Sequence, residues 1–420
     1  MPSTIRRLLL GKPLETRQLA HERLNNFLGL AVFASDALSS TAYATEEILI
    51  ALVVAGAAGL HYSLSVSSAI VILLFIVVVS YRQVVHAYPG GGGSYVVSRE
   101  NLGPMAAQIA GAALMSDYVL TVAVSVSSGV AAITSAVPAL HDLRVELTLG
   151  AIALITLVNL RGVRESARLF AVFAYSFLAV IAALLLLGFY KLATGTPMPV
   201  ATYPALEISQ GLGLFLLLKA FASGCAALTG IEAVSNGVQA FKEPAARNAG
   251  RVLVLLGLLL AIIFLGVTYL ARALELVPLA NETVLSQLGR AIFGGGTLLY
   301  YLVQIFTCVI LIIAANTSFN GFPRLAAIEA ADGFLPRQLT NLGDRLVYSN
   351  GILALGITAG LLVLAFKAEV HALIPLYAIG VFLAFTMSQA GMVVHWLRER
   401  GSAWQFRLVI NSLEIGRAHV

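Results

Sequence analysis

Long runs of apolar residues, separated by short polar segments, occupy almost the whole chain. A helix needs about 20 predominantly apolar residues to cross a bilayer, and ten runs approach or exceed that length, the fourth being short. They cover residues 26–52, 64–86, 104–137, 146–160, 167–191, 211–240, 250–272, 291–318, 350–366 and 371–397. The pattern predicts an all-α integral membrane protein with one transmembrane domain, residues 26–397, after a polar cytoplasmic segment, residues 1–25.

Two of the predicted spans are interrupted by small and polar residues. The first contains FASDALSSTAY, residues 33–43, and the sixth contains FASGCAALTGIEA, residues 221–233, so that both interruptions begin with FAS. Helices unwind at such points where the freed backbone faces protein or water. A matched pair of interrupted spans is typical of the binding site of an inverted-repeat transporter, and it predicts a five-plus-five repeat with helices 1 and 6 broken. The alternative is that Gly and Ser only permit close helix packing.

Composition indicates a membrane protein, and the sequence lacks the motifs of several common enzyme classes. Hydrophobic residues make up 59% of the chain and charged residues only 11%, with a mean hydropathy of +0.89, which excludes a soluble domain. The sequence contains no G-x-S-x-G, H-E-x-x-H or G-x-x-x-x-G-K-[ST] motif, so we predict neither an enzyme nor a cofactor. GGGGSY, residues 90–95, has no preceding strand and no following Lys, and we interpret it as a flexible turn rather than a phosphate loop.

The basic residues indicate how the chain is oriented. Cytoplasmic loops carry an excess of Lys and Arg, and here the basic residues gather in every second loop. One side would hold Arg6, Arg7, Lys12, Arg17, Arg23, Arg82, Arg99, Arg161, Arg164, Arg168, Lys242, Arg247, Arg251, Arg324, Arg337, Arg345, Arg398, Arg400 and Arg407. The other would hold only Arg144, Lys191, Arg272, Arg290 and Lys367. We therefore predict a multi-pass protein of the cell membrane with a cytoplasmic N-terminus, and we interpret the net charge of +5 as a topology signal rather than as a sign of nucleic-acid binding.

Acidic and hydroxyl residues inside the spans are candidates for a binding site. A charge at bilayer depth costs between about 3 and more than 10 kcal/mol, so such residues usually face a cavity with partners, and Asp36 in the first interruption therefore needs a ligand. Asp117, Thr121 and Ser125 are spaced four residues apart in the third span, on one stripe of a helix. Alone, Thr and Ser in such helices usually bond their own backbone.

Further polar residues stand near the same level of the membrane. Glu232 follows the second interruption, Tyr43 follows the first, and Tyr377 lies near the start of the tenth span. Glu46, Glu47 and Lys219 are weaker candidates, because salt bridges or contact with the membrane surface explain them equally well. For His86, His141, His371 and His395, near span ends, an interfacial role is the default interpretation.

Two stretches resemble a known family. FASDALSSTAYATEEIL together with YPGGGGSYVVSRENLG resembles the potassium importers of the KUP family, within the amino acid, polyamine and organocation (APC) superfamily. FPRLAAIEAADGFLP, residues 322–336, is similar to a loop motif of that superfamily. The resemblance covers essentially the whole visible chain, and it implies a fold similar to LeuT-type transporters and proton-coupled potassium uptake.

The resemblance also implies roles for individual residues. The expected potassium ligands are Asp36, Tyr43, Thr121, Ser125, Thr229 and Tyr377. We expect the proton to be carried by Glu232, with Asp117 as its rival, and potassium and the proton to be transported substrates rather than cofactors. An acid at position 36, where amino acid permeases usually have a Gly-rich motif, would repel a substrate carboxylate.

Two other functions remain open on these grounds. A proton-coupled amino acid or polyamine permease of the same fold is the first alternative, and a polyamine would suit the acids. A potassium channel is the second, although the sequence contains no TVGYG filter.

The end of the sequence also carries information. Residues 398–413 read as a loop and the start of a further span. EIGRAHV, residues 414–420, resembles the translation of a sequencing adapter, so we expect a non-native tail and a natural chain that continues. In the family a cytoplasmic C-terminal region carries dimerisation and regulation by cyclic di-AMP, and a homodimer is implied only through that region, which is not visible in this sequence.

Overall fold

The computed structural model describes residues 23–91, 93–162, 167–200, 211–343, 347–401 and 403–417. Every regular element within these ranges is a helix, which confirms the all-α prediction. Most of the predicted N-terminal segment lies outside the described residues, as do Arg164 and Arg345 of the basic loops and residues 418–420 of the predicted tail.

The helices follow the predicted spans. They are α2 and α3 (Asn26–Ser40, Ala44–Val53), α4 and α5 (Gly56–Leu60, Ser63–Ala87), α7 (Pro104–Ala136), α8 (Arg144–Leu160), α9 (Ala167–Ala193), α10 and α11 (Leu214–Gly224, Glu232–Asn236), α12 (Ala245–Ala273), α14 (Leu298–Ala331), α15 (Ser349–Ala365) and α16 (Val370–Arg398). Among the described residues nine helical segments are long and apolar enough to cross a membrane. The apolar helix α15, with 17 residues, is just shorter.

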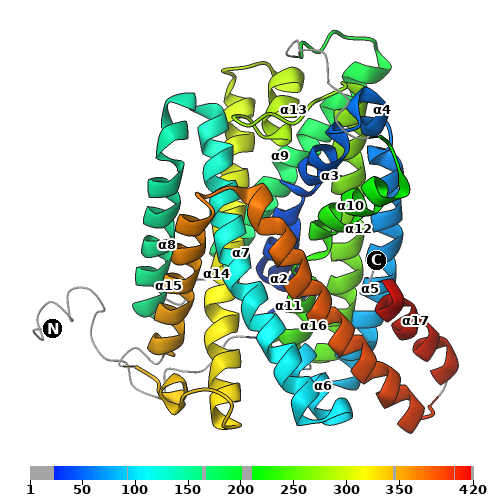
Figure 1. The fold of residues 1–420 in the computed structure, drawn as a ribbon, viewed down its shortest axis with the longest axis vertical. Coiled ribbons are helices and arrows are strands. Elements are labelled where there is room, and N and C mark those ends of the chain that lie inside the picture. The colour runs from blue at the N-terminus through cyan, green and yellow to red at the C-terminus, as the bar shows by residue number, and fades with distance from the viewer. Residues whose placement is uncertain are drawn as a thin grey trace, which may run out of the picture.

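Three further α-helices lie outside these spans in the described part of the chain. They are α6 (Ser94–Leu102), α13 (Val284–Phe293) and α17 (Trp404–Arg417). Figure 1 shows α4 and α13 at one end of the bundle and α6 at the opposite end. The two ends of the bundle are therefore marked by different short helices.

The eighth span differs from its prediction at both ends. Gly294 and Gly296 have φ values of 89° and 80°, a conformation that glycine adopts readily, so the chain turns there and α14 begins at Leu298 rather than at 291. At the other end the helix runs on to Ala331. Most of the predicted loop motif, residues 322–336, is therefore helical, because Leu325, Ala326 and Ala330 are buried and hold this turn-rich stretch in the bundle.

The packing of the spans agrees with a five-plus-five repeat. The third and eighth spans, α7 and α14, pack along each other, and so do the second and seventh, α5 and α12. In a five-plus-five repeat, the third span corresponds to the eighth and the second to the seventh. Spans that correspond in this way and also touch each other lie around the centre of the repeat. The first and sixth spans are both broken, as predicted.

The breaks begin later than the FAS triplets suggested. Helix α2 continues through Ser35 and Asp36 to Ser40, and the chain turns only at residues 41–43. The hydroxyls of Ser35 and Ser39 donate to the carbonyls of Val32 and Asp36, at 3.1 and 2.6 Å, and such local bonds let Ser remain helical. In the sixth span α10 ends at Gly224, and a short 3-10 turn and an extended Thr229 precede α11. The two triplets therefore lie at different distances from their breaks.

Candidate functional site

The second break contacts helix α2 through its backbone. Gly230 has a φ of 78°, and a Cβ added there would lie 2.5 Å from the backbone nitrogen of Ala37. No side chain fits this position, because the obstructing atoms belong to the backbone of α2. Beside this contact the hydroxyls of Ser40 and Thr229 lie 2.6 Å apart, so that a hydrogen bond links the two breaks.

Further hydroxyls surround this link. The Tyr43 hydroxyl donates to Ser40 at 3.2 Å, and the Thr121 hydroxyl donates to that of Tyr377 at 3.1 Å. Tyr43, Thr121 and Tyr377 are 4%, 2% and 1% exposed, so none of these oxygens depends on bulk water. Four spans, the first, third, sixth and tenth, thus contribute hydroxyls to one buried cluster.

Asp36 belongs to this cluster but has no hydrogen-bond donor of its own. Its charge acts on both Tyr43 and Tyr377, and its backbone carbonyl accepts from Ser39. Within the described ranges no group donates a hydrogen bond to its carboxylate. The side chain of Asp36 is half-buried, and a carboxylate that is partly removed from water and has no donor is stabilised by a cation beside it.

Ser125 lies one helical turn beyond Thr121 on α7 and is 1% exposed. The structure places it on the stripe that the spacing predicted. Its position as a potassium ligand stays a prediction.

Asp117 lies near the other two acids. The charges of Asp36 and Glu232 both act on it, and Gly380 of α16 approaches its backbone, since an added Cβ would lie 3.5 Å from the Asp117 nitrogen. One carboxylate oxygen of Asp117, Oδ1, is fully buried and has no partner among the described residues. This oxygen is available to a proton or to a cation.

Glu232 has a different environment, rich in donors. Its Oε1 accepts from the backbone N–H and the hydroxyl of Ser94, at 2.8 and 2.7 Å, and its Oε2 accepts from the hydroxyl of Tyr81 at 3.2 Å. Hydrogen bonds of this kind stabilise the charged form of a carboxylate. Glu232 therefore holds the first residue of α6 against the sixth span.

The glycine-rich turn is packed rather than free. A Cβ added to Gly93 would lie 2.0 Å from Oδ1 of Asn236, and one added to Gly91 would lie 3.2 Å from the carbonyl oxygen of that residue. The side chain of Gln239 donates to the carbonyl of Gly90. The predicted turn is present at Gly90 and Gly93, and its glycines allow the chain to lie directly on the segment after the second break. Its flexibility stays a prediction.

The other side of α6 is bonded to the end of α14. Tyr95 and Arg99 both donate to Oδ2 of Asp332, the latter at 2.9 Å. The hydrogen bond from Tyr95, together with Arg99, lowers the pKa of Asp332, so this residue stays charged. Helix α6 thus closes one end of the bundle by polar contacts to the sixth and eighth spans, which both belong to the second half of the repeat.

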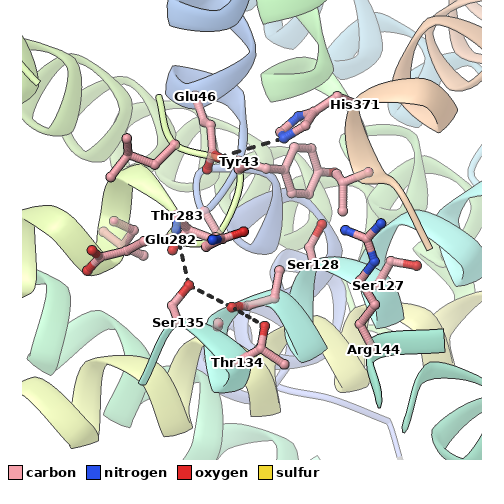
Figure 2. A pocket seen from close by; sticks show the side chains of 18 of the residues that line it. Tyr43, Glu46, Ser127, Ser128, Thr134, Ser135, Arg144, Glu282, Thr283 and His371 are labelled. Atoms are coloured by element: carbon pink, nitrogen blue, oxygen red, sulfur yellow. Dashed lines mark hydrogen bonds and ion pairs between the residues drawn. The ribbon is translucent and has the colours of Figure 1, made fainter. Parts of the chain in front are cut away.

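A cavity of about 70 Å³ adjoins the cluster on the side of α13. Tyr43, Glu46, Ser128 and His371 are among the side chains that line it, as Figure 2 shows. Nδ1 of His371 bonds Glu47, and its Nε2 lies 3.8 Å from Glu46. The neighbour of these two acids is therefore His371, and no ion pair joins either of them to Lys219 among the described residues.

Sequence reasoning missed several of these residues. Tyr81 and Ser94 gave no signal, because they are distant in sequence from Glu232 and have common spacings. The consecutive serines Ser127 and Ser128, which line the cavity, continue the spaced hydroxyls of the third span. That continuation was the available signal.

Comparison with known proteins agrees with this architecture. A family model described as amino acid permease matches residues 26–413. The potassium transporter KimA of Bacillus subtilis (strain 168) is 47% identical over 413 residues, which cover 98% of this chain and 68% of that protein. Because the family model spans most of the chain and so close a relative shares nearly all of it, the chain belongs to the amino acid permease family.

Proposed function

We propose that this protein imports potassium ions together with protons across the cell membrane. As a member of a permease family it is a transporter rather than an enzyme, and the relative that shares 47% of its residues is a potassium transporter. One structural observation carries the proposal: the Asp36 carboxylate has no donor among the described residues and shares its surroundings with the buried hydroxyls of Tyr43 and Tyr377. A set of hydroxyl oxygens beside one acid suits a dehydrated potassium ion.

In this mechanism potassium exchanges its water for oxygens contributed by four spans. The proposed ligands are Asp36, Tyr43, Thr121, Ser125, Thr229 and Tyr377. The link between Ser40 and Thr229, at 2.6 Å, keeps the two breaks together around the ion. Movement of one bundle relative to the other around this site then exposes it to either side of the membrane in turn.

Either Asp117 or Glu232 carries the proton, and the contacts favour Asp117. Both oxygens of Glu232 accept hydrogen bonds, which stabilise the form without a proton. Asp117 has a buried oxygen without a partner in the described part of the chain, and it feels the charge of Asp36. A proton on Asp117 removes the repulsion between its carboxylate and that of Asp36. A cation bound at Asp36 compensates the same charge, and so takes the place of the proton.

A bacterial strain that lacks its own potassium importers tests the function. Expression of the full-length gene is expected to restore growth at limiting potassium and uptake of radioactive rubidium, both increasing with external acidity. Unlabelled potassium should compete with rubidium, whereas spermidine, arginine and alanine should not. Competition by one of these organic compounds, without competition by potassium, would instead support the amino acid or polyamine permease.

The same proposal places the N-terminus in the cytoplasm, because the basic residues of the chain gather in alternate loops. With Cys225 and Cys308 replaced, an impermeant thiol reagent added outside cells is expected to label Thr196→Cys and to spare Arg161→Cys. Opening the cells should make the second position reactive as well. Labelling of only Arg161→Cys in intact cells would reverse the orientation.

A further inference from the structure

The cavity beside Tyr43 contains three buried hydroxyls without partners. Ser127, Ser128 and Thr307 line it and are 2%, 6% and 3% exposed. The side-chain oxygen of each has no hydrogen-bond partner among the described residues. A buried polar atom left unpaired costs about 1–3 kcal/mol of folding free energy. Three such hydroxyls around one cavity therefore indicate an occupant that interacts with their oxygen atoms.

The charges around the cavity favour a positive occupant. Glu46 is buried, and its Oε2 accepts from the backbone N–H of Val284 at 3.2 Å. Its Oε1 lies 3.8 Å from Nε2 of His371, a distance longer than a hydrogen bond. The two arginines nearby are paired, Arg144 with Glu369 and Arg290 with Glu282, and the Nδ1 of His371 bonds Glu47. The Oε1 atom of Glu46 therefore remains available.

These ligands select among cations. A divalent or transition metal ion prefers several carboxylate or imidazole ligands, and the described residues contain no cluster of three or more such side chains that could hold one. One carboxylate oxygen with neutral hydroxyl oxygens matches a monovalent cation instead. The volume of about 70 Å³ leaves room for such an ion with some of its water.

We propose that this cavity is a second, outer binding site for a monovalent cation such as potassium, formed by Glu46, Ser127, Ser128 and Thr307. It is distinct from the Asp36 site, and Tyr43 separates the two, since Tyr43 lines the cavity while its hydroxyl donates to Ser40. Figure 2 shows the Tyr43 ring close to Ser128 and Glu46. The inference rests on the proposed cation transport and adds a place where the ion loses part of its water before it passes Tyr43.

Equilibrium binding of radioactive rubidium to the purified full-length protein tests this site. The background variant is Asp36→Asn, which disables the inner site and leaves the cavity intact. We expect this variant to keep one class of rubidium sites. Adding Ser128→Ala and Thr307→Val should then weaken the remaining binding by about tenfold or more, because each removes an oxygen ligand to a charge.

Two further variants control for packing. Ser63 is also buried with an unpartnered hydroxyl but does not line the cavity, so Ser63→Ala should leave rubidium binding unchanged. Thr307→Ser keeps the oxygen, and it should bind rubidium better than Thr307→Val at equal thermal stability. If loss of the cavity hydroxyls leaves binding unaltered, the cavity holds only water and the inference is wrong. If Asp36→Asn abolishes all binding, no independent outer site exists.

The result can be separated from the proposed function. Normal potassium uptake by Asp36→Asn would contradict the inner site, whereas the outer site is judged from rubidium bound to the cavity variants. Each proposal can therefore fail without the other.

Discussion

Replacing Asp36 with Asn is expected to lower potassium uptake at limiting concentration by roughly 100-fold. The change keeps the shape of the side chain and removes the charge that compensates the ion among buried hydroxyls. Loss of one partner of a buried charge pair costs about 3 kcal/mol or more, which corresponds to that factor in affinity. The measurement is initial uptake of rubidium against concentration in the importer-deficient strain, at equal abundance in the membrane.

Asp142→Asn is the matched control for this experiment. Asp142 lies in an exposed turn after α7, so its neutralisation removes the same charge from the protein without touching the hydroxyl cluster. Uptake by Asp142→Asn should equal that of the unmodified protein. Equal uptake by Asp36→Asn at limiting potassium would show that Asp36 is not a ligand.

Replacing Asp117 with Asn is expected to abolish potassium accumulation driven by a proton gradient. An amide mimics the protonated acid and cannot release a proton, while exchange of potassium for rubidium should continue. In liposomes with an imposed pH difference of one unit, coupling of one proton per ion supports about tenfold accumulation, and the variant should show none. A permeant anion must hold the membrane potential near zero, because 100 mV adds about 2.3 kcal/mol per charge.

Glu232→Gln is the discriminating partner variant. Gln keeps one acceptor oxygen, so this variant loses the acceptor for either Ser94 or Tyr81 and weakens the attachment of α6. It should still accumulate potassium in response to the pH difference. If Glu232→Gln loses that response and Asp117→Asn keeps it, the proton belongs to Glu232. This outcome would favour the hypothesis drawn from the sequence alone.

The spans and the broken helices could be predicted because each depends on a local pattern. Hydropathy over about 20 residues located the spans, and the pairing of two interrupted spans predicted which helices are broken. The stripe of Asp117 and Thr121 was visible because four-residue spacing holds along one helix. The partner of Thr121 is Tyr377, at 3.1 Å, and this contact required the family resemblance, since 256 residues separate the two.

Other features depend on contacts that no local pattern encodes. The end of α2 at Ser40 reflects hydroxyls that bond the preceding turn, so polarity alone placed the break too early. The bonds between Ser94 and Glu232 join segments 138 residues apart, and the glycine-rich turn gave no sign of its partner. The outer cavity combines hydroxyls of α7 and α14, which became neighbours only through the packing of the third and eighth spans.

The contact between Gly230 and Ala37 joins two spans through atoms that take no part in the proposed recognition of the substrate. Its atoms are backbone atoms, and no part of it uses the Asp36 carboxylate, which projects from the same turn of α2. Evolution could therefore exchange the residue at position 36 while the joint of the two half-helices stays unaltered. A substitution at position 36 then changes the chemistry beside the hydroxyl cluster and leaves the scaffold unaltered, which is consistent with a chain so similar to a potassium transporter matching a family of amino acid permeases.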